Sequence, residues 1–311
     1  MYHIKLNELQ VFKQKCIEAL TQLSGYDNLI HALKKDDDFF EVVAGHSNSI
    51  SDIEVVKGFA PQNLFGPPID ITFDSYLENI IKPLLSTDSP YDDRKLRLDK
   101  VELLKGTHEN PEKLLLHLGP TIYQHYRQDI ERMPVDALKR MLKGIEHDGN
   151  PYAYFTKTVG VTAVALSQQG HVFLGERSAH IDYPGYIHVA GGLATFCDDI
   201  QQVNLYHDTQ RELEEEIELV FGEHYSTVNL IGIAGNPLTS EMDAVFIIET
   251  HLDDDFFYQC KLTEHQRLVR ISHKKEAQNL LFNGMLPNET QPKSLIFSTA
   301  FALNYLMHYH F

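Results

Sequence analysis

The sequence predicts an α/β fold, because strand-like segments in its second half lead into an acidic helix. Residues 159–166 alternate in the way that a strand does. Residues 168–170 are typical of a turn, and a second strand begins at residues 171–174. A short extended run, residues 187–192, then ends in two glycines before the acidic segment at residues 211–216. Two further apolar runs after the helix, at residues 228–234 and 244–249, favour a sheet of several strands.

The acidic segment reads Arg-Glu-Leu-Glu-Glu-Glu, and its phase predicts a helix with two distinct faces. At about 100° per residue, the apolar side chains Leu213, Ile217 and Val220 share one face. Three carboxylates share a second face, with Arg211 on its flank: Glu212, Glu215 and Glu216. Carboxylates at about 4 Å repel one another by roughly 4 kcal/mol per pair at an effective dielectric near 20. Oxygen ligands gathered on one helix face suit Mg²⁺ or Mn²⁺.

The other elements follow from apolar spacing and from turn residues. Further strands are expected at residues 228–234 and 244–249, and helices at residues 1–35, 74–85, 264–281 and 293–309. Residues 50–75 contain short extended pieces that Pro61, Pro67 and Pro68 interrupt. Residues 114–123 predict a strand end, a turn and a helix start. At 311 residues the chain favours two parts, an N-terminal accessory region over residues 1–149 that contributes to the substrate pocket or to an oligomer contact, and a core over residues 150–311.

Composition excludes several classes of protein. Asp plus Glu number 44 against 27 for Lys plus Arg, and the net charge of −17 disfavours binding to nucleic acid or to an anionic membrane. The three cysteines are far apart and contain no C-x-x-C pair, which argues against a disulfide framework or a structural zinc site. No run approaches the length of a membrane span, and the N-terminus lacks a signal-peptide pattern. A cytoplasmic protein is therefore expected.

The residues around the acidic helix resemble the box of the Nudix hydrolases, G-x5-E-x7-R-E-U-x-E-E-x-G-U, in which U is aliphatic. Gly192 matches the first glycine, and residues 211–216 match the R-E-U-x-E-E core in order. The chain departs from the box at three points. The acid six residues after Gly192 is Asp198 in place of Glu, the gap from Asp198 to Arg211 is longer by five residues, and Glu218 replaces the late glycine. The resemblance implies a Nudix α/β/α sandwich with a mixed sheet, extended at its N-terminus by an α/β region.

Within this superfamily the chain is similar to the UDP-glucose diphosphatases of animals. The similarity lies in residues 116–123 (LHLGPTIY), in the long box with residues 203–205, and in residues 230–236 followed by 244–246. It implies Mg²⁺-dependent hydrolysis of a UDP-sugar, in which UDP-glucose gives UMP and glucose 1-phosphate. The expected partner is thus a small nucleotide-sugar substrate, and a homo-oligomer is compatible with the sequence.

The resemblance also implies roles for the box residues. Glu212 and Glu216 would be the main metal ligands, with Glu215 a third ligand or the group that takes a proton from water. The main-chain carbonyl of Gly192 would be a further ligand. Arg211 would orient the carboxylates through Asp198, or through another partner if the long loop displaces that residue.

Several positions outside the helix are weaker candidates. A later loop of Nudix enzymes often supplies another acid, for which Glu241, Asp243 and Glu264 are the candidates here, although each fits an ordinary surface acid better than a ligand. Arg177 follows the second core strand and is a candidate for contact with phosphate, or else a structural arginine. Asn236 is a candidate for contact with sugar or base, but Asn-Pro is also a common turn pair.

Two alternatives remain open at this stage. The same chemistry with another substrate, such as ADP-ribose, NADH or a dinucleotide, would need the same box. A Nudix-fold nucleotide-binding module without catalysis would explain the irregular box and the large N-terminal region. A role directed at nucleic acid ranks last, because it requires a basic channel that the acidic composition does not favour.

Overall fold

The computed structural model describes residues 6–35, 37–44, 50–58, 73–85, 87, 93–105 and 112–311. Within these residues, eight strands form a mixed sheet in the order β1-β9-β10-β5-β6-β11, with β7 beside β6 and β8 beside β5. In chain order the strands are β1 (Phe40–Ala44), β5 (Val159–Leu166), β6 (Val172–Arg177), β7 (Ile187–His188), β8 (Ala190–Leu193), β9 (Asn229–Gly235), β10 (Met242–Glu249) and β11 (His265–Ile271). The β10–β5 pair is parallel and its neighbours are antiparallel, so the sheet is mixed.

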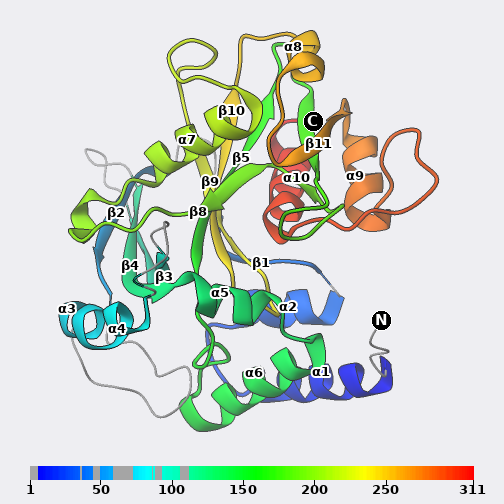
Figure 1. The fold of residues 1–311 in the computed structure, drawn as a ribbon. Coiled ribbons are helices and arrows are strands. Elements are labelled where there is room, and N and C mark those ends of the chain that lie inside the picture. The colour runs from blue at the N-terminus through cyan, green and yellow to red at the C-terminus, as the bar shows by residue number, and fades with distance from the viewer. Residues whose placement is uncertain are drawn as a thin grey trace.

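Both faces of this sheet are apolar and covered, as strands buried on two sides require. Along β10, Phe246 contributes to one core cluster, whereas Val245 and Ile247 contribute to the other. Helix α7 (Leu205–Ile217) covers the first face, and α10 (Phe297–Tyr309) packs on the second (Figure 1). The predicted fold class, an α/β/α sandwich around a mixed sheet with an N-terminal α/β extension, is confirmed.

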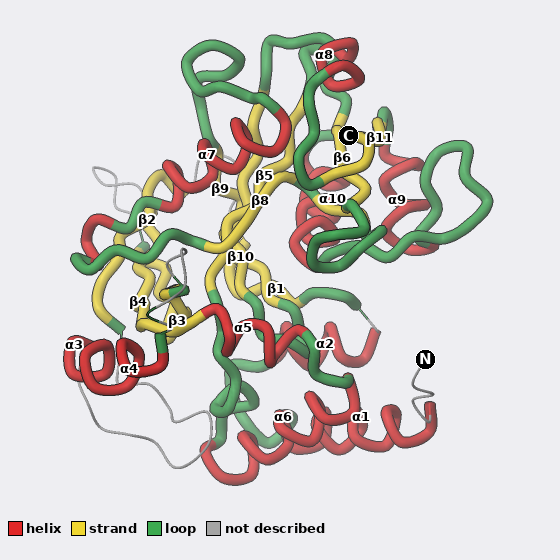
Figure 2. Tube along the Cα trace, in the orientation of Figure 1, coloured by secondary structure: helices red, strands yellow, loops and turns green. Residues whose placement is uncertain are grey.

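The N-terminal extension has a sheet of its own. Strands β2 (Ile50–Lys57), β4 (Glu112–Ile122) and β3 (Arg94–Leu104) form it in that order, and Figure 2 shows it to one side of the main sheet. Beside this sheet lie α3 (Phe73–Tyr76), the π-helical turn η1 (Leu77–Ile81) and α4 (Lys82–Leu84). Four other helices belong to the extension, namely α1 (Leu6–Leu20), α2 (Asp27–Lys35), α5 (Tyr123–Ile130) and α6 (Pro134–Asp148). Side chains of the extension and of the main sheet share one continuous core cluster, and β1 pairs directly with β9.

Most of the predicted elements are present, with shifted ends. The strands expected at 159–166, 228–234 and 244–249 correspond to β5, β9 and β10, and the helix expected at 74–85 corresponds to α3, η1 and α4. The expected helix over residues 1–35 is two helices among its described residues, because Gly25 takes a φ of +87° that ends α1 and leads to α2. Residues 59–72, which include the three prolines, lie outside the described residues.

The predicted helix over residues 264–281 is wrong in its first half. Residues His265–Ile271 form β11, which pairs antiparallel with β6 at the end of the sheet. The hydrogen bonds of the sheet edge override the local preference of this segment, and Arg267 donates to the buried carboxylate of Glu176 on β6 at 2.8 and 2.6 Å. A new helix, α9 (Lys274–Asn283), then begins at the cap residue His273. Helix α8 (Asp254–Gln259) precedes the strand, and α10 begins at Phe297, later than residue 293.

We compared the helices of the described residues with the length and hydropathy of a membrane span. None of them combines the length and the apolar character needed to cross a bilayer.

Candidate active site

Helix α7 presents the predicted acidic face as two buried carboxylates and one exposed carboxylate. The side chain of Asn204 caps the helix by accepting from the N–H of His207 at 3.1 Å. Glu212 and Glu216, one helical turn apart, are 9% and 2% exposed, whereas Glu215 is exposed. Glutamates are rarely buried unless they are paired, so this burial marks the two positions as unusual.

Two glycines of β8 let the buried glutamates approach the strand. The N–H of Gly191 donates to Glu216 Oε1 at 3.0 Å. A Cβ atom at Gly192 would lie 2.5 Å from Glu212 Oε1, which is closer than a real Cβ tolerates. Gly192 therefore lets the carboxylate of Glu212 lie against the main chain of β8, whereas a Cβ atom at Gly191 would meet the carbonyl oxygen of Val161 at 2.3 Å.

Arg211 contacts the glutamates of its own helix. Its guanidinium donates to Glu212 Oε1 at 2.6 Å and to Glu215 Oε2 at 3.1 Å. Asp198 instead accepts from Arg94 of β3 at 2.7 Å, and its side chain is 72% exposed. The long loop before α7 has thus carried Asp198 away from Arg211, and the expected Arg211–Asp198 contact is not among those that the described residues make.

The electrostatics at Glu212 and Glu216 disfavour two negative charges without a cation. Burial raises the pKa of Glu216 well above its usual value, and repulsion from Glu264 and Glu212 raises it further. Burial also raises the pKa of Glu212, although Arg211 opposes this shift. Glu216 Oε2 has no hydrogen-bond partner among the described residues, and His265 Nδ1 lies 3.4 Å away. Burial lowers the pKa of His265 to about 3, so that its imidazole is neutral and supplies no charge.

A cavity of about 400 Å³ opens in front of this helix face. Of the predicted site residues, eight line it: Arg177, Gly192, Arg211, Glu212, Glu215, Glu241, Asp243 and Glu264. Glu216 lies behind this wall, against Gly191. Two predicted residues are elsewhere. Asp198 is bound to Arg94, and the side chain of Asn236 caps a turn by accepting from the N–H groups of Leu238 and Thr239.

The three candidate loop acids occupy different parts of the cavity. Glu241 is buried and accepts from the hydroxyls of Tyr183 at 2.6 Å and Thr239 at 3.0 Å. Burial raises the pKa of Asp243 on β10 to about 8, with repulsion from Glu241 as a second cause. Glu264 accepts from Arg177 at 3.2 Å and stands near enough to Glu212 and Glu216 to raise the pKa of both.

Arg177 faces the cavity, and each of its three nitrogens donates one hydrogen bond to a protein atom. The guanidinium donates to the carbonyl of Asp182 at 2.7 Å and to His188 Nδ1 at 3.0 Å, in addition to Glu264. This pattern matches both roles that the sequence left open, a structural arginine and one that faces a ligand.

Several lining residues were not predicted from the sequence. They are Lys95, Tyr123, Tyr126, Asp182, Tyr183 and His188. Lys95 belongs to β3, and Tyr123 and Tyr126 belong to α5, so the N-terminal extension forms part of the cavity wall. One signal in the sequence pointed here, namely the segment 116–123, because it ends at Tyr123.

The donor set of the cavity fits a divalent cation. Six lining residues carry carboxylates (Asp182, Glu212, Glu215, Glu241, Asp243 and Glu264), whereas three are Lys or Arg (Lys95, Arg177 and Arg211). The unpartnered oxygen of Glu216 adds a buried acceptor behind them. Within the described residues, however, no three His, Cys, Asp or Glu side chains are already gathered as a metal cluster. Arg211 offers a reason, since its guanidinium lies on Glu212 and Glu215 in place of another cation.

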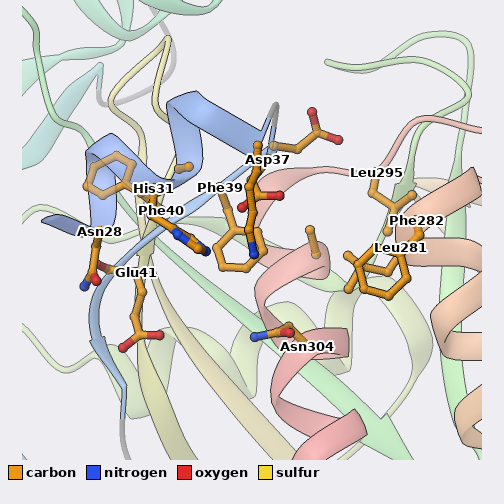
Figure 3. Close-up of a pocket in the computed structure, with 14 residues that line it drawn as sticks. Asn28, His31, Asp37, Phe39, Phe40, Glu41, Leu281, Phe282, Leu295 and Asn304 are labelled. Carbon is orange, nitrogen blue, oxygen red and sulfur yellow. The ribbon is translucent and has the colours of Figure 1, made fainter. Parts of the chain in front are cut away.

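A second cavity, of about 390 Å³, lies between α2 and β1 on one side and α9 and α10 on the other (Figure 3). Figure 3 shows Phe39 facing Leu281 and Phe282 across it, with Asp37 at its rim. None of the predicted site residues lines this cavity. We therefore place the candidate site in the cavity in front of α7.

No family model and no curated protein matches the chain. Among solved structures, it is similar to a MutT protein from Methanosarcina mazei Go1, with 16% identity over 48% of this chain and 93% of that one, at a TM-score of 0.30. A bifunctional NMN adenylyltransferase/ADP ribose pyrophosphatase from Francisella tularensis shares 12% identity over 61% of this chain and 52% of that one, at a TM-score of 0.34. The NUDIX domain of Shewanella oneidensis NrtR, complexed with ADP ribose, shares 17% identity over 53% of this chain and 96% of its own, at a TM-score of 0.33. At these identities and TM-scores the likenesses carry no argument about this chain.

Proposed function

We propose that this protein is a Mg²⁺-dependent Nudix hydrolase that cleaves the diphosphate of a nucleoside diphosphate derivative. One observation carries the proposal. Glu212 and Glu216 of the R-E-L-E-E-E helix lie one turn apart against the Gly191-Gly192 strand, with Glu212 in the wall of a cavity in which carboxylates outnumber cations and Glu216 behind that wall. Such a cavity opposes an anionic diphosphate on its own and favours one that enters together with divalent cations.

We propose a role for each residue of the site, which its position supports. Glu212 and Glu216, helped by Glu215 and the carbonyl of Gly192, would hold Mg²⁺, with Mn²⁺ as a substitute. A cation bound there would neutralise phosphate charge and lower the pKa of water. Glu215 would accept a proton from that water, a role that its exposure at the cavity supports. Arg211 donates one hydrogen bond to Glu212 and one to Glu215, and its positive charge would reduce the repulsion between these two carboxylates.

We further propose that the substrate is a UDP-sugar, with UDP-glucose and water giving UMP and glucose 1-phosphate. The similarity of residues 116–123 to the UDP-glucose diphosphatases supports this choice. That segment ends at Tyr123, which lines the cavity. The N-terminal accessory region over residues 1–149 would then act on substrate choice.

The test is product analysis by chromatography with Mg²⁺ and a panel of UDP-glucose, UDP-galactose, ADP-ribose, NADH and a dinucleoside polyphosphate. We expect the UDP-sugars to be cleaved to UMP and hexose 1-phosphate faster than the other substrates are cleaved. Faster cleavage of ADP-ribose would retain the hydrolase and replace its substrate. Nucleotide binding without any product would favour a non-catalytic module and contradict the proposal.

A further inference from the structure

One part of the cavity is built from residues that the Nudix box does not contain. We call it the acceptor wall and define it as Tyr123, Tyr126, Asp182, Tyr183 and Glu241, all of which line the cavity. The two tyrosines at 123 and 126 come from α5, and the others come from loops around the main sheet. The acceptor wall therefore joins the N-terminal extension to the core at the site.

The inner half of the acceptor wall is centred on the buried carboxylate of Glu241. The hydroxyls of Tyr183 and Tyr126 both donate to it, the first at 2.6 Å. Burial raises the pKa of both phenols, so that they keep their protons and remain donors. With their hydrogens directed at Glu241, these two hydroxyls offer lone pairs to any ligand.

The outer half is centred on Asp182 and has the same polarity. Tyr123 donates its hydroxyl hydrogen to Asp182 Oδ2 at 3.3 Å, and Arg127 forms an ion pair with the same carboxylate. Tyr183 holds its place with a φ of +55°, a conformation that costs a non-glycine residue on the order of 1–2 kcal/mol. The contacts of the wall thus outweigh a local backbone strain.

A ligand at the acceptor wall meets acceptors, and the cation that forms an ion pair with Asp182, Arg127, is shared with a second carboxylate, Glu131, which leaves an excess of negative charge. Arg177, the cation that contacts the main chain of Asp182, already binds Glu264 and His188. A sugar bears several hydroxyl donors, which match such a wall. A pyrimidine base such as uracil has a single ring N–H donor between two carbonyl acceptors, and a carboxylate has acceptors alone, so both match it poorly.

We propose that the acceptor wall binds the uncharged, hydroxyl-bearing glycosyl half of the diphosphate substrate and rejects sugars that carry a carboxylate. This inference rests on the proposed function for the position of the diphosphate at α7. It adds that the charge of Asp182 determines specificity against carboxylate sugars, whereas the tyrosine hydroxyls supply acceptors for the hydroxyls of the sugar. Discrimination should then follow the charge of the sugar and not its size.

The wild-type protein supplies the first test, as kcat/KM for UDP-glucose, UDP-xylose and UDP-glucuronate with Mg²⁺. UDP-xylose lacks the group that is a carboxylate in UDP-glucuronate, so it separates charge from size. We expect similar values for UDP-glucose and UDP-xylose and a value at least about ten-fold lower for UDP-glucuronate, a difference of about 1.4 kcal/mol. Equal turnover of UDP-glucuronate would overturn the inference, and so would rejection of UDP-xylose as strong as that of UDP-glucuronate.

The second test compares Asp182→Asn with the matched variant Tyr123→Phe. The first removes a charge and keeps the shape, whereas the second removes a hydrogen bond to the same carboxylate and keeps the charge. Asp182→Asn should lower the ratio of kcat/KM for UDP-glucose to kcat/KM for UDP-glucuronate by about three-fold. Tyr123→Phe should leave this ratio unchanged. Both substrates are measured on one preparation, so the ratio does not depend on how much of a variant is folded. An unchanged ratio in Asp182→Asn would contradict the role of its charge.

Binding without turnover distinguishes this inference from the proposed function. The shift in Tm that UDP-glucose and UDP-glucuronate produce at matched concentration requires no hydrolysis. A larger shift with UDP-glucose, in a protein that cleaves neither, would support the acceptor wall and contradict the hydrolase. Equal shifts would overturn the acceptor wall whatever the activity, and the absence of any shift and of any product would overturn both.

Discussion

The variant Glu216→Gln should make the metal-free protein more stable and less active. Glu216 is 2% exposed, and its Oε1 atom accepts from the N–H of Gly191. A glutamine keeps this acceptor and the shape of the side chain. It removes a negative charge that is disfavoured by burial and by repulsion from the neighbouring carboxylates of Glu264 and Glu212.

The size of the stabilisation follows from two quantities, because the buried NH₂ of a glutamine takes the place of the unpartnered Oε2 and keeps its burial cost. Repulsion from a carboxylate one helical turn away, at about 6 Å and an effective dielectric near 20, adds roughly 3 kcal/mol. Proton uptake limits the total, because protonating a carboxyl of ordinary pKa 4.5 at about pH 7.5 costs about 4 kcal/mol. With partial loss of this gain to imperfect packing, we expect the free energy of unfolding to rise by about 1–3 kcal/mol.

The assay is thermal unfolding in EDTA together with hydrolysis in Mg²⁺. The gain corresponds to a rise in Tm of about 2–6 °C for a chain of this size, and hydrolysis should fall by at least about 100-fold. Glu214→Gln is the matched control, since Glu214 is on the same helix and is exposed. It should change neither quantity. A lower Tm for Glu216→Gln in EDTA, or full activity in Mg²⁺, would refute the reasoning.

The remaining predictions concern other positions around α7. Gly192→Ala places a Cβ atom 2.5 Å from Glu212 Oε1 and should lower kcat at least about ten-fold with little change in folding; unchanged kcat would show that the close approach is dispensable. Asp198→Asn should change kcat/KM less than about two-fold, because Asp198 is outside the cavity, and a large loss would return it to the site. Glu218 ends α7 with a φ of +57°, which glycine adopts without strain. Glu218→Gly should therefore raise the free energy of unfolding, measured by urea titration, by up to about 1 kcal/mol. A lower free energy of unfolding would mean that contacts of the Glu218 side chain outweigh the strain. Burial holds the pKa of His188 well below 6.5, so this imidazole is neutral when folded and takes up a proton when unfolded. Stability should therefore fall as the pH drops below 6.5, by up to about 1.4 kcal/mol per pH unit, and His188→Gln should reduce this slope.

The acidic helix could be predicted because its information is local. The phase of Leu213 and Ile217 against Glu212 and Glu216 is contained within six residues, and α7 buries all four. The glycine pair before it is also readable, since the backbone must approach closely there. The sequence therefore predicted the part of the cavity wall that α7 and the glycine pair form.

The acceptor wall could not be predicted in the same way, because its contacts join distant segments. Tyr123 and Asp182 are 59 residues apart in the sequence, and Tyr183 and Glu241 are 58 apart. Nothing in the local pattern of a tyrosine indicates a partner at that separation. The N-terminal extension was therefore expected near the pocket in general terms, without its residues.

One error and one alternative that the sequence left open have separate physical causes. Strand β11 is at the end of the sheet order and is half exposed, so its sequence mixes polar and apolar residues, and its pairing with β6 decides its conformation. For Asp198 the sequence allows contact with Arg211 or displacement by the five extra residues, and Asp198 binds Arg94 on the other sheet. Tertiary contacts determine both positions.

Metal binding tests the central claim most directly. We would titrate Mn²⁺ into the wild type, Glu212→Gln and Glu214→Gln and follow free Mn²⁺ by electron paramagnetic resonance. The account predicts binding to the wild type and to Glu214→Gln, and an affinity at least about ten-fold weaker in Glu212→Gln. Equal Mn²⁺ binding by the wild type and Glu212→Gln would show that the buried carboxylates of α7 are not the metal site.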